Sequence, residues 1–133
     1  MKTKLYLTGL LFIITIFSCK KGEIIGTGPF SEMEFKEKEF DFGKLNQGDK
    51  VSTTFEFANP SATALQIKEA HGSCGCTVPE YPKTPIQPGK TGKIKVSFNS
   101  AGKQGSVKKT VTLLANTKSG VQVLTIYADV QTK

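Results

Sequence analysis

The sequence predicts an all-β fold: an antiparallel, immunoglobulin-like β-sandwich of about seven strands. From Glu32 onward, apolar residues recur at every second position in short segments, which is the pattern of half-buried antiparallel strands. Turn residues such as Asn59-Pro60 and Pro88-Gly89 separate these segments. No segment carries a sustained stripe of apolar residues at helical spacing. Short strands divided by frequent turns are typical of a sandwich rather than of a helical or mixed domain.

The expected strands follow this alternation along the chain. The residues predicted to face the core are Met33 and Phe35; Phe40 and Phe42, ending at Gly43; Val51, Thr53, Phe55 and Phe57; Leu65 and Ile67; Ile94, Val96 and Phe98; Val107, Val111 and Leu113; and Val121, Val123 and Thr125, followed on the other phase by Ile126, Ala128 and Val130. Lys108 and Lys109 predict a β-bulge or a shift of face between Val107 and Val111. Pro79, Pro82, Pro85 and Pro88 predict a stiff crossing that forms no regular strand pairing.

The first residues have the pattern of an export signal. Lys2 and Lys4 precede an unbroken apolar run that ends at Phe17 and is short for a permanent membrane helix. We therefore expect residues 1–18 to be a signal peptide. The following Cys19 resembles the lipidated first residue of mature bacterial lipoproteins, and a diacylated cysteine would anchor the chain to a membrane. The alternatives are an ordinary secretory signal with an incidental cysteine, and an uncleaved anchor.

The remaining chain is long enough for one domain and too short for two. Residues 19–31 have charge, Gly and Pro but no period, which predicts a tether, and residues 32–133 are the expected domain. Removal of the signal leaves 16 lysines against 11 acidic residues, a net charge of +5, and the chain contains no Arg. Because an exported protein meets no nucleic acid, and because Arg favours phosphate and base recognition, we expect no nucleic-acid partner.

The pair Cys74 and Cys76, separated by Gly75, is the strongest candidate site. Side chains at positions i and i+2 of an extended chain point to one face, so the two sulfurs would lie together. Gly75 can adopt a positive φ, which would curl the backbone and bring them closer. One interpretation is a structural disulfide or a buried thiol pair in an exported protein that meets oxidants. Another is a redox exchange pair, although the C-x-x-C spacing of thioredoxin-like sites is absent.

A third interpretation adds His71 to Cys74 and Cys76 as a metal site. Two thiolates and an imidazole would suit Cu(I) or Zn(II), and copper is favoured because three such ligands suffice for it. Copper is the cofactor that the sequence favours, and apart from a metal at this site we expect none.

The segment that follows predicts a binding loop. Its prolines make it rigid, Pro88-Gly89 sets a turn, and the ring of Tyr81 could stack on a sugar or a peptide or pack flat on the sandwich. Motifs for other chemistry are absent: there is no Gly-rich phosphate loop, no G-x-S-x-G and no H-E-x-x-H. We therefore expect no catalytic residues and no enzymatic activity.

The stretch from FDFG to LLANT resembles the bacterial envelope family catalogued as domain of unknown function 1573. Members pair a strand ending in FG with a later CGCT, a Pro-Gly turn and a G-x-x-x-K-T-V strand, which here are Phe42-Gly43, Cys74 to Thr77, Pro88-Gly89 and Gly105 to Val111. The resemblance covers about Glu32 to Val130. The chain is more distantly similar to Hydin-type and major-sperm-protein-type immunoglobulin-like domains, which are binding modules. The resemblance implies a fold and an envelope location, but no activity.

These patterns lead us to expect a lipid-anchored, non-catalytic binding or assembly module in the envelope of a Gram-negative bacterium. It would meet a membrane through Cys19, on the periplasmic face or at the cell surface. An exposed strand edge, or one end of the sandwich that carries Cys74, Cys76 and the proline loop together, would meet an unidentified envelope protein or glycan. The alternative function is a periplasmic thiol–disulfide or copper-binding protein that uses Cys74 and Cys76.

Overall fold

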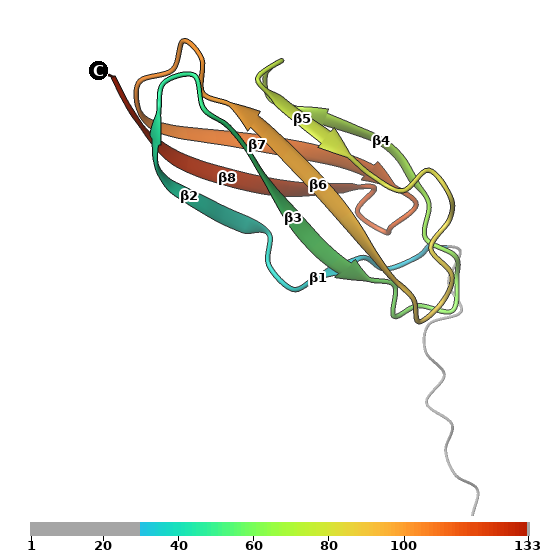
Figure 1. Ribbon diagram of the computed structural model, residues 1–133. Helices are drawn as coiled ribbons and strands as arrows, with labels where there is room; N and C mark the ends of the chain where they lie inside the picture. The colour runs from blue at the N-terminus through green and yellow to red at the C-terminus, as the bar shows by residue number, and fades with distance from the viewer. Residues whose placement is uncertain (1–29, 133) are drawn as a thin grey trace, which may run out of the picture.

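The computed structural model describes residues 30–132, which form two packed β-sheets (Figure 1). The strands are β1 (Glu34–Phe35), β2 (Glu39–Asn46), β3 (Lys50–Ala58), β4 (Ile67–Gly72), β5 (Thr77–Glu80), β6 (Thr91–Asn99), β7 (Gly105–Ala115) and β8 (Val121–Gln131). One sheet has the order β1-β3-β6-β5 and the other β2-β8-β7-β4. The predicted immunoglobulin-like β-sandwich is therefore confirmed. Among residues 30–132, no helix is long and apolar enough to cross a membrane.

The sheets are antiparallel except at one pair. β2 pairs with β8 in parallel, whereas every other strand pairing runs antiparallel. The chain leaves the first sheet after β1 and enters the second as β2 without reversing, so it meets β8 running the same way. Gly43, expected to end a strand, instead lies at a register shift inside β2 with φ of 68°. Its N–H donates to Asp41 Oδ1 at 2.8 Å.

The core lies between the inward faces of the two sheets. It contains most of the residues that the alternation predicted, including Phe55, Phe57, Leu65, Ile67, Ile94, Val96, Phe98, Val111 and Leu113. The rings of Phe42 and Phe98 stack across the interior with centroids 6.5 Å apart, which joins β2 of one sheet to β6 of the other. Apolar burial of this kind is the main source of stability for such a fold.

Two expectations for the last strands are wrong. Val121 and Val123 are 43% and 45% exposed, because the inward phase of β8 is that of Leu124 and Ile126. The predicted bulge between Val107 and Val111 does not form, since β7 pairs with β8 in unbroken register. Both segments carry apolar residues on two phases, and alternation alone does not say which phase the core selects.

β5 is not among the strands predicted from the sequence. Pro79, expected to prevent pairing, lies inside β5 and opposite Val96 of β6. The Asn99 N–H donates to the Cys76 carbonyl at 2.9 Å, so Cys76 and Asn99 form a hydrogen-bonded pair. Hydrogen-bonded and non-hydrogen-bonded pairs alternate along an antiparallel ladder, so the pair of Pro79 and Val96 is a non-hydrogen-bonded one. The missing N–H of Pro79 consequently faces away from β6. Because β5 is an edge strand, proline is tolerated there.

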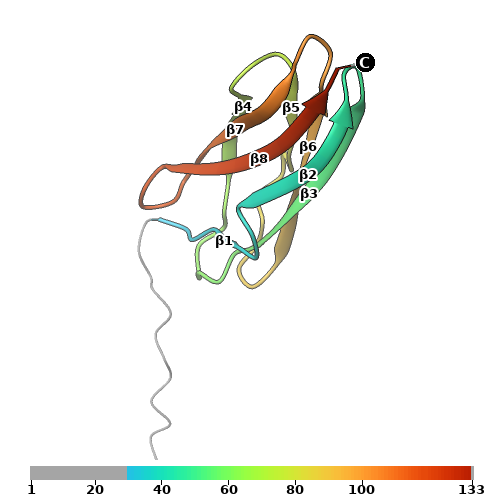
Figure 2. The ribbon, with the colours of Figure 1, turned by 90° about the vertical axis from the view of Figure 1, so that its left-hand side faces the viewer.

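The sandwich has two distinct ends, which Figures 1 and 2 show at opposite extremes of the strands. The Phe30 end consists of residues 30–31, the β3–β4 loop 59–66, the β5–β6 loop 81–90 and the β7–β8 turn 116–120. The cysteine end consists of the β4–β5 turn 73–76, residues 47–49, the β6–β7 loop 100–104 and the last residue of β8, Gln131.

Buried polar side chains join the loops of the Phe30 end. The side chain of Asn59, which is fully buried, donates to the carbonyls of Thr63 and Ile86, both at 2.9 Å. Its Oδ1 accepts hydrogen bonds from Ser61 and from the hydroxyl of Ser31. Ser31, which the sequence placed in the tether, is thus a buried part of the domain.

Candidate functional site: the disulfide turn

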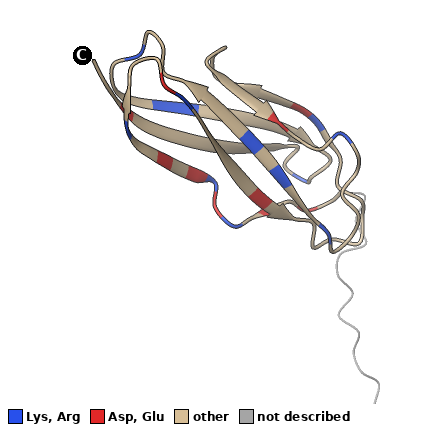
Figure 3. Cartoon of the chain, viewed as in Figure 1, with Lys and Arg blue, Asp and Glu red and all other residues tan. Residues whose placement is uncertain are grey.

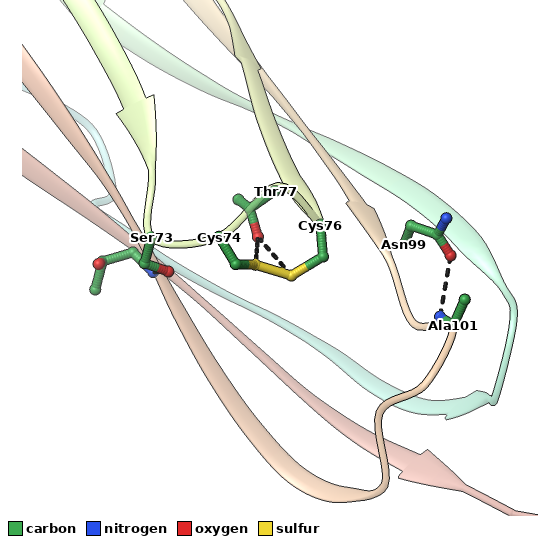
Figure 4. Close-up of a disulfide and its surroundings, with 7 residues drawn as sticks. Ser73, Cys74, Cys76, Thr77, Asn99 and Ala101 are labelled. Carbon is green, nitrogen blue, oxygen red and sulfur yellow. Dashed lines mark hydrogen bonds between the residues drawn. A yellow bond between two sulfur atoms is a disulfide. The ribbon is translucent and has the colours of Figure 1, made fainter.

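The turn between β4 and β5 carries the chain from one sheet to the other (Figure 4). Ser73 is bonded to β7, because its N–H donates to the Thr110 carbonyl at 2.8 Å and its Oγ accepts from the Thr110 N–H at 3.1 Å. At the other side of the turn, the Cys76 carbonyl accepts from Asn99 on β6. The turn is therefore fixed to a strand of each sheet.

Cys74 and Cys76 form a disulfide within this turn, with their Cα atoms 5.2 Å apart. Both sulfurs lie near the buried hydroxyl of Thr77, whose Oγ1 is 3.6 Å from Cys74 Sγ and 3.8 Å from Cys76 Sγ. The Thr77 N–H also donates to the Cys74 carbonyl at 3.1 Å. Of the interpretations left open by the sequence, the described structure has the bonded pair. The disulfide closes a turn and does not itself span the two sheets.

The glycine that permits the turn is Gly72 rather than Gly75. Gly75 does not adopt a positive φ, and a Cβ placed there would meet no atom within 4 Å. A Cβ on Gly72 would lie 1.9 Å from the Thr77 carbonyl oxygen, which is far inside van der Waals contact. The absence of a side chain at Gly72 lets the end of β4 approach the start of β5. The role predicted for Gly75 is thus wrong, although a glycine is required nearby.

His71 does not join the cysteines in a metal-ligating group. Its ring lies on β4, where Nε2 is 2.9 Å from Glu69 Oε2 and the side chain is exposed. Among the side chains of residues 30–132, no three His, Cys, Asp or Glu gather as metal ligands would. Copper binding by Cys74, Cys76 and His71 stays a prediction.

The predicted binding loop lies at the Phe30 end and not beside the cysteines. Gly89 donates through its N–H to the Asn59 carbonyl at 2.7 Å, which places the Pro88-Gly89 turn against the β3–β4 loop. Tyr81 packs against the core, and its hydroxyl donates to the Lys68 carbonyl at 3.4 Å. Lys83 Nζ lies 3.4 Å from the centre of the Tyr81 ring. The expectation of one end with both cysteines and the proline loop is therefore wrong, because β5 separates them.

A shallow depression of about 370 Å³ adjoins the disulfide on the outer face of β3, β5 and β6. Cys76 and Gly75 form one side of it, and Ser52 and Ser97 lie across its floor. Val78 lines it and is 54% exposed, the largest exposed fraction among the large apolar side chains of the described residues. Val78 is not among the site residues predicted from the sequence, although its position between Thr77 and Pro79 in an alternating pattern could have placed it outward.

The same outer face carries ion pairs farther along the strands. Glu56 on β3 contacts Lys36 and Lys93, and Glu80 on β5 contacts Lys95. The hydrogen bond from Lys36, with a smaller one from Lys93, lowers the pKa of Glu56 below its ordinary value. The same bond raises the pKa of Lys36. All these groups are solvated, so they contribute little to folding.

Cys19, the predicted lipidation site, lies outside the described residues, as do the predicted signal peptide 1–18 and most of the tether 19–31.

Solved structures with this fold come from unrelated sources. A protein of unknown function from Porphyromonas gingivalis W83 superposes with a TM-score of 0.66 at 18% identity, over 74% of this chain and 46% of that one. The PapD-like domain 7 of human CEP192 superposes with a TM-score of 0.64 at 8% identity, over 98% and 99%. The VesB protease of Vibrio cholerae gives 0.56 at 19% identity, over 74% and 31%.

These likenesses concern the fold alone. The chain spans about half the length of the Porphyromonas protein and about a third of the protease. A comparison with curated proteins finds no match. At the sequence level, residues 33–130 match the family described as protein of unknown function (DUF1573), which covers β1 to β8 almost completely. The chain therefore belongs to the DUF1573 family.

Proposed function

We propose that the protein is a lipid-anchored, non-catalytic binding or assembly module of the cell envelope, and that a protein partner contacts its cysteine end. The apolar run before Ser18 and Cys19 supports export and lipid attachment. The family resemblance supports an envelope location. The partner surface is the depression beside the disulfide, bordered by Cys76 and Val78.

The exposure of Val78 beside a doubly fixed turn is the observation that carries this proposal. Covering a solvent-exposed valine with a partner removes apolar surface from water, which stabilises the complex. The disulfide, Ser73 and Asn99 already restrict the turn, so little conformational entropy remains to be lost on binding. Ser52 and Ser97 supply hydroxyls that can orient a partner through hydrogen bonds.

Photo-crosslinking in the host tests the partner surface. A photoreactive residue at Val78 should give a defined protein adduct, and the adduct should weaken strongly when Cys74 and Cys76 are both replaced by serine. The matched control is Val123, which is similarly exposed but lies on the outer face of the other sheet. Equal adducts from both positions, or none from Val78, would contradict the proposal.

Intact-mass analysis of protein extracted from its host tests the anchor. Cleavage before Cys19 with a diacylglycerol and an acyl chain on that residue is the expected result. An unmodified Cys19, or a mass that includes residues 1–18, would refute lipid attachment without affecting the partner surface.

The position of Thr77 favours thiol–disulfide exchange as a second candidate function. Its hydroxyl lies near both sulfurs and can donate a hydrogen bond to whichever thiolate is released when a partner thiolate attacks the other sulfur. In that case the purified protein should turn over a model disulfide in the presence of a thiol reductant, with both cysteines required. A Thr77→Val variant should slow the reaction, and turnover that survives loss of both cysteines would exclude this function.

A further inference from the structure

The three loops of the Phe30 end form one connected surface. Ser31 pairs with Thr117 of the β7–β8 turn, and Leu65 of the β3–β4 loop pairs with Ile86 of the β5–β6 loop. The side chain of Asn116 joins the β7–β8 turn to the β3–β4 loop, because its Oδ1 accepts from Gln66 at 2.7 Å and its Nδ2 donates to the Ala64 carbonyl at 2.9 Å. These bonds therefore join the three loops to one another and to the point at which the described chain begins.

This surface carries an excess of positive charge. Loops 59–66, 81–90 and 116–120 contain three lysines, Lys83, Lys90 and Lys118, and no Asp or Glu (Figure 3). All three lysines are exposed. No ion pair within residues 30–132 involves them. Glu32 and Glu34 line a depression with Lys118 and offset two positive charges, whereas Lys38 in the same depression adds one, so the charge of this end stays positive.

An exposed aromatic side chain lies on the same end. Phe30 is 52% exposed and precedes Ser31, which is bonded to the β7–β8 turn. Aromatic side chains next to lysines are suited to the boundary between lipid headgroups and acyl chains, where the ring enters the apolar layer and the ammonium groups meet phosphate.

The opposite end has no such excess of charge. The turns 47–49, 73–76 and 100–104 contain one lysine, Lys103, and one acid, Asp49. Phe30 follows the predicted lipid site, Cys19, by eleven positions. That length of extended chain reaches roughly 40 Å at most, and much less when coiled. A lipid on Cys19 would therefore keep the Phe30 end close to a bilayer surface.

We propose that the Phe30 end is a membrane-contacting surface that binds anionic lipid headgroups through Lys83, Lys90 and Lys118, so that the cysteine end projects away from the bilayer. The inference rests on the proposed lipid anchor for its geometry, and it adds the lipid class and the orientation of the domain. Each lysine close to an anionic membrane strengthens the binding of the domain to that membrane about fivefold.

Lysine labelling on vesicles tests the proposal. The full chain, extracted from its host, is placed on vesicles of phosphatidylcholine alone or with added phosphatidylglycerol, and an amine-reactive reagent is followed by peptide mass spectrometry. Labelling of Lys83, Lys90 and Lys118 should be about fivefold slower on the anionic vesicles, whereas Lys103 should not change. Added salt should remove the difference, because it screens exposed charges.

Matched variants separate this inference from the anchor. Replacement of Lys83, Lys90 and Lys118 by Gln should remove the effect of phosphatidylglycerol on Phe30-end protection. Replacement of Lys44, Lys50 and Lys103 by Gln removes the same charge elsewhere in the domain. It should leave the effect of phosphatidylglycerol unchanged. If the protein floats with neutral vesicles but shows equal labelling on both kinds, the anchor stands and the inference is wrong.

A chain that does not float with neutral vesicles refutes the anchor. In that case, flotation with anionic vesicles that is lost only when Lys83, Lys90 and Lys118 are replaced would still support the lysine surface. A chain that does not float with anionic vesicles either would overturn the lysine surface. Equal protection by a soluble anionic polysaccharide without vesicles would overturn the assignment to lipid.

Discussion

The two ends of this sandwich are fixed in different ways. The Phe30 end has the long loops 59–66 and 81–90, and buried hydrogen bonds from Asn59 join them to each other and to Ser31. The cysteine end has short turns, which a disulfide, a close backbone approach at Gly72 and bonds to neighbouring strands keep in place.

The difference teaches where each end is vulnerable. Long loops bury polar backbone groups, which must find partners inside the protein, so loss of one polar side chain leaves several groups unsatisfied. The turns of the cysteine end bury fewer polar side chains, among them Ser100, whose hydroxyl donates to the Asn46 and Asp49 carbonyls, and they depend on steric fit as well. Polar substitutions should therefore damage the Phe30 end more, and added volume should damage the cysteine end more.

The largest effect is expected for Asn59→Ala. This change removes five hydrogen bonds in a fully buried environment, to Thr63, Ile86, Ser61 and Ser31. Since a buried group left unsatisfied costs about 1–3 kcal/mol, the free energy of unfolding should fall by at least about 3 kcal/mol in urea titrations.

Asn99→Ala is the matched control at the cysteine end. Its side chain makes one exposed hydrogen bond, to the Ala101 N–H at 3.0 Å. Its loss should cost less than about 1 kcal/mol. Equal effects of the two substitutions would remove the distinction between a polar and a steric end.

An intermediate effect is expected for Gly72→Ala. The added Cβ would overlap the Thr77 carbonyl, and overpacking of this kind typically costs about 1–3 kcal/mol. Gly75→Ala adds the same methyl group to open space and should change stability by no more than about 0.5 kcal/mol. Both variants can be compared by urea unfolding with the disulfide intact. A larger loss for Gly75→Ala would show that the turn depends on the glycine between the cysteines after all.

The smallest effect is expected for Glu56→Gln, which lies on the sheet between the two ends. The pKa of Glu56 is lowered in the folded protein by Lys36 and Lys93, so its stabilising contribution is present above the unfolded pKa and is lost as the pH falls through the folded one. The variant should therefore show a slightly weaker fall in stability on acidification than the unsubstituted protein. Glu37→Gln is the control, because Glu37 makes no ion pair among residues 30–132. Identical acid profiles for Glu56→Gln and the unsubstituted chain would rule out a contribution from these ion pairs.

Sequence patterns predicted the core strands because one phase of each was clearly more apolar. Phe55 and Phe57, or Val96 and Phe98, alternate with polar residues and lie inward as expected. In the last strand, Val123 and Leu124 are both apolar, so the pattern contains no information about which faces the core. Register across the sheet decides this, and register is not a local property.

The candidate site was predictable in its residues but not in its surroundings. The spacing of Cys74 and Cys76 indicated a bonded pair as one of several states. The need for glycine at Gly72 arises from contact with Thr77, five positions later, and no local pattern reveals it. The proline loop is separated from the cysteines by β5. The sequence did not predict this strand, because Pro79 lies inside it and proline argues against strand pairing.

Pro79 affects how copies of the protein can associate when they are crowded on a membrane. Along the open edge of β5 the Thr77 N–H is bonded to Cys74 and Pro79 has none, so this edge offers carbonyl acceptors but no free backbone donor. Proteins confined to a membrane plane meet one another at far higher local concentration than in solution, and in similar orientations. An edge without donors is a poor template for a neighbouring strand. In the anchored state proposed above, a single proline would let many copies share a surface without polymerising through the β5 edge.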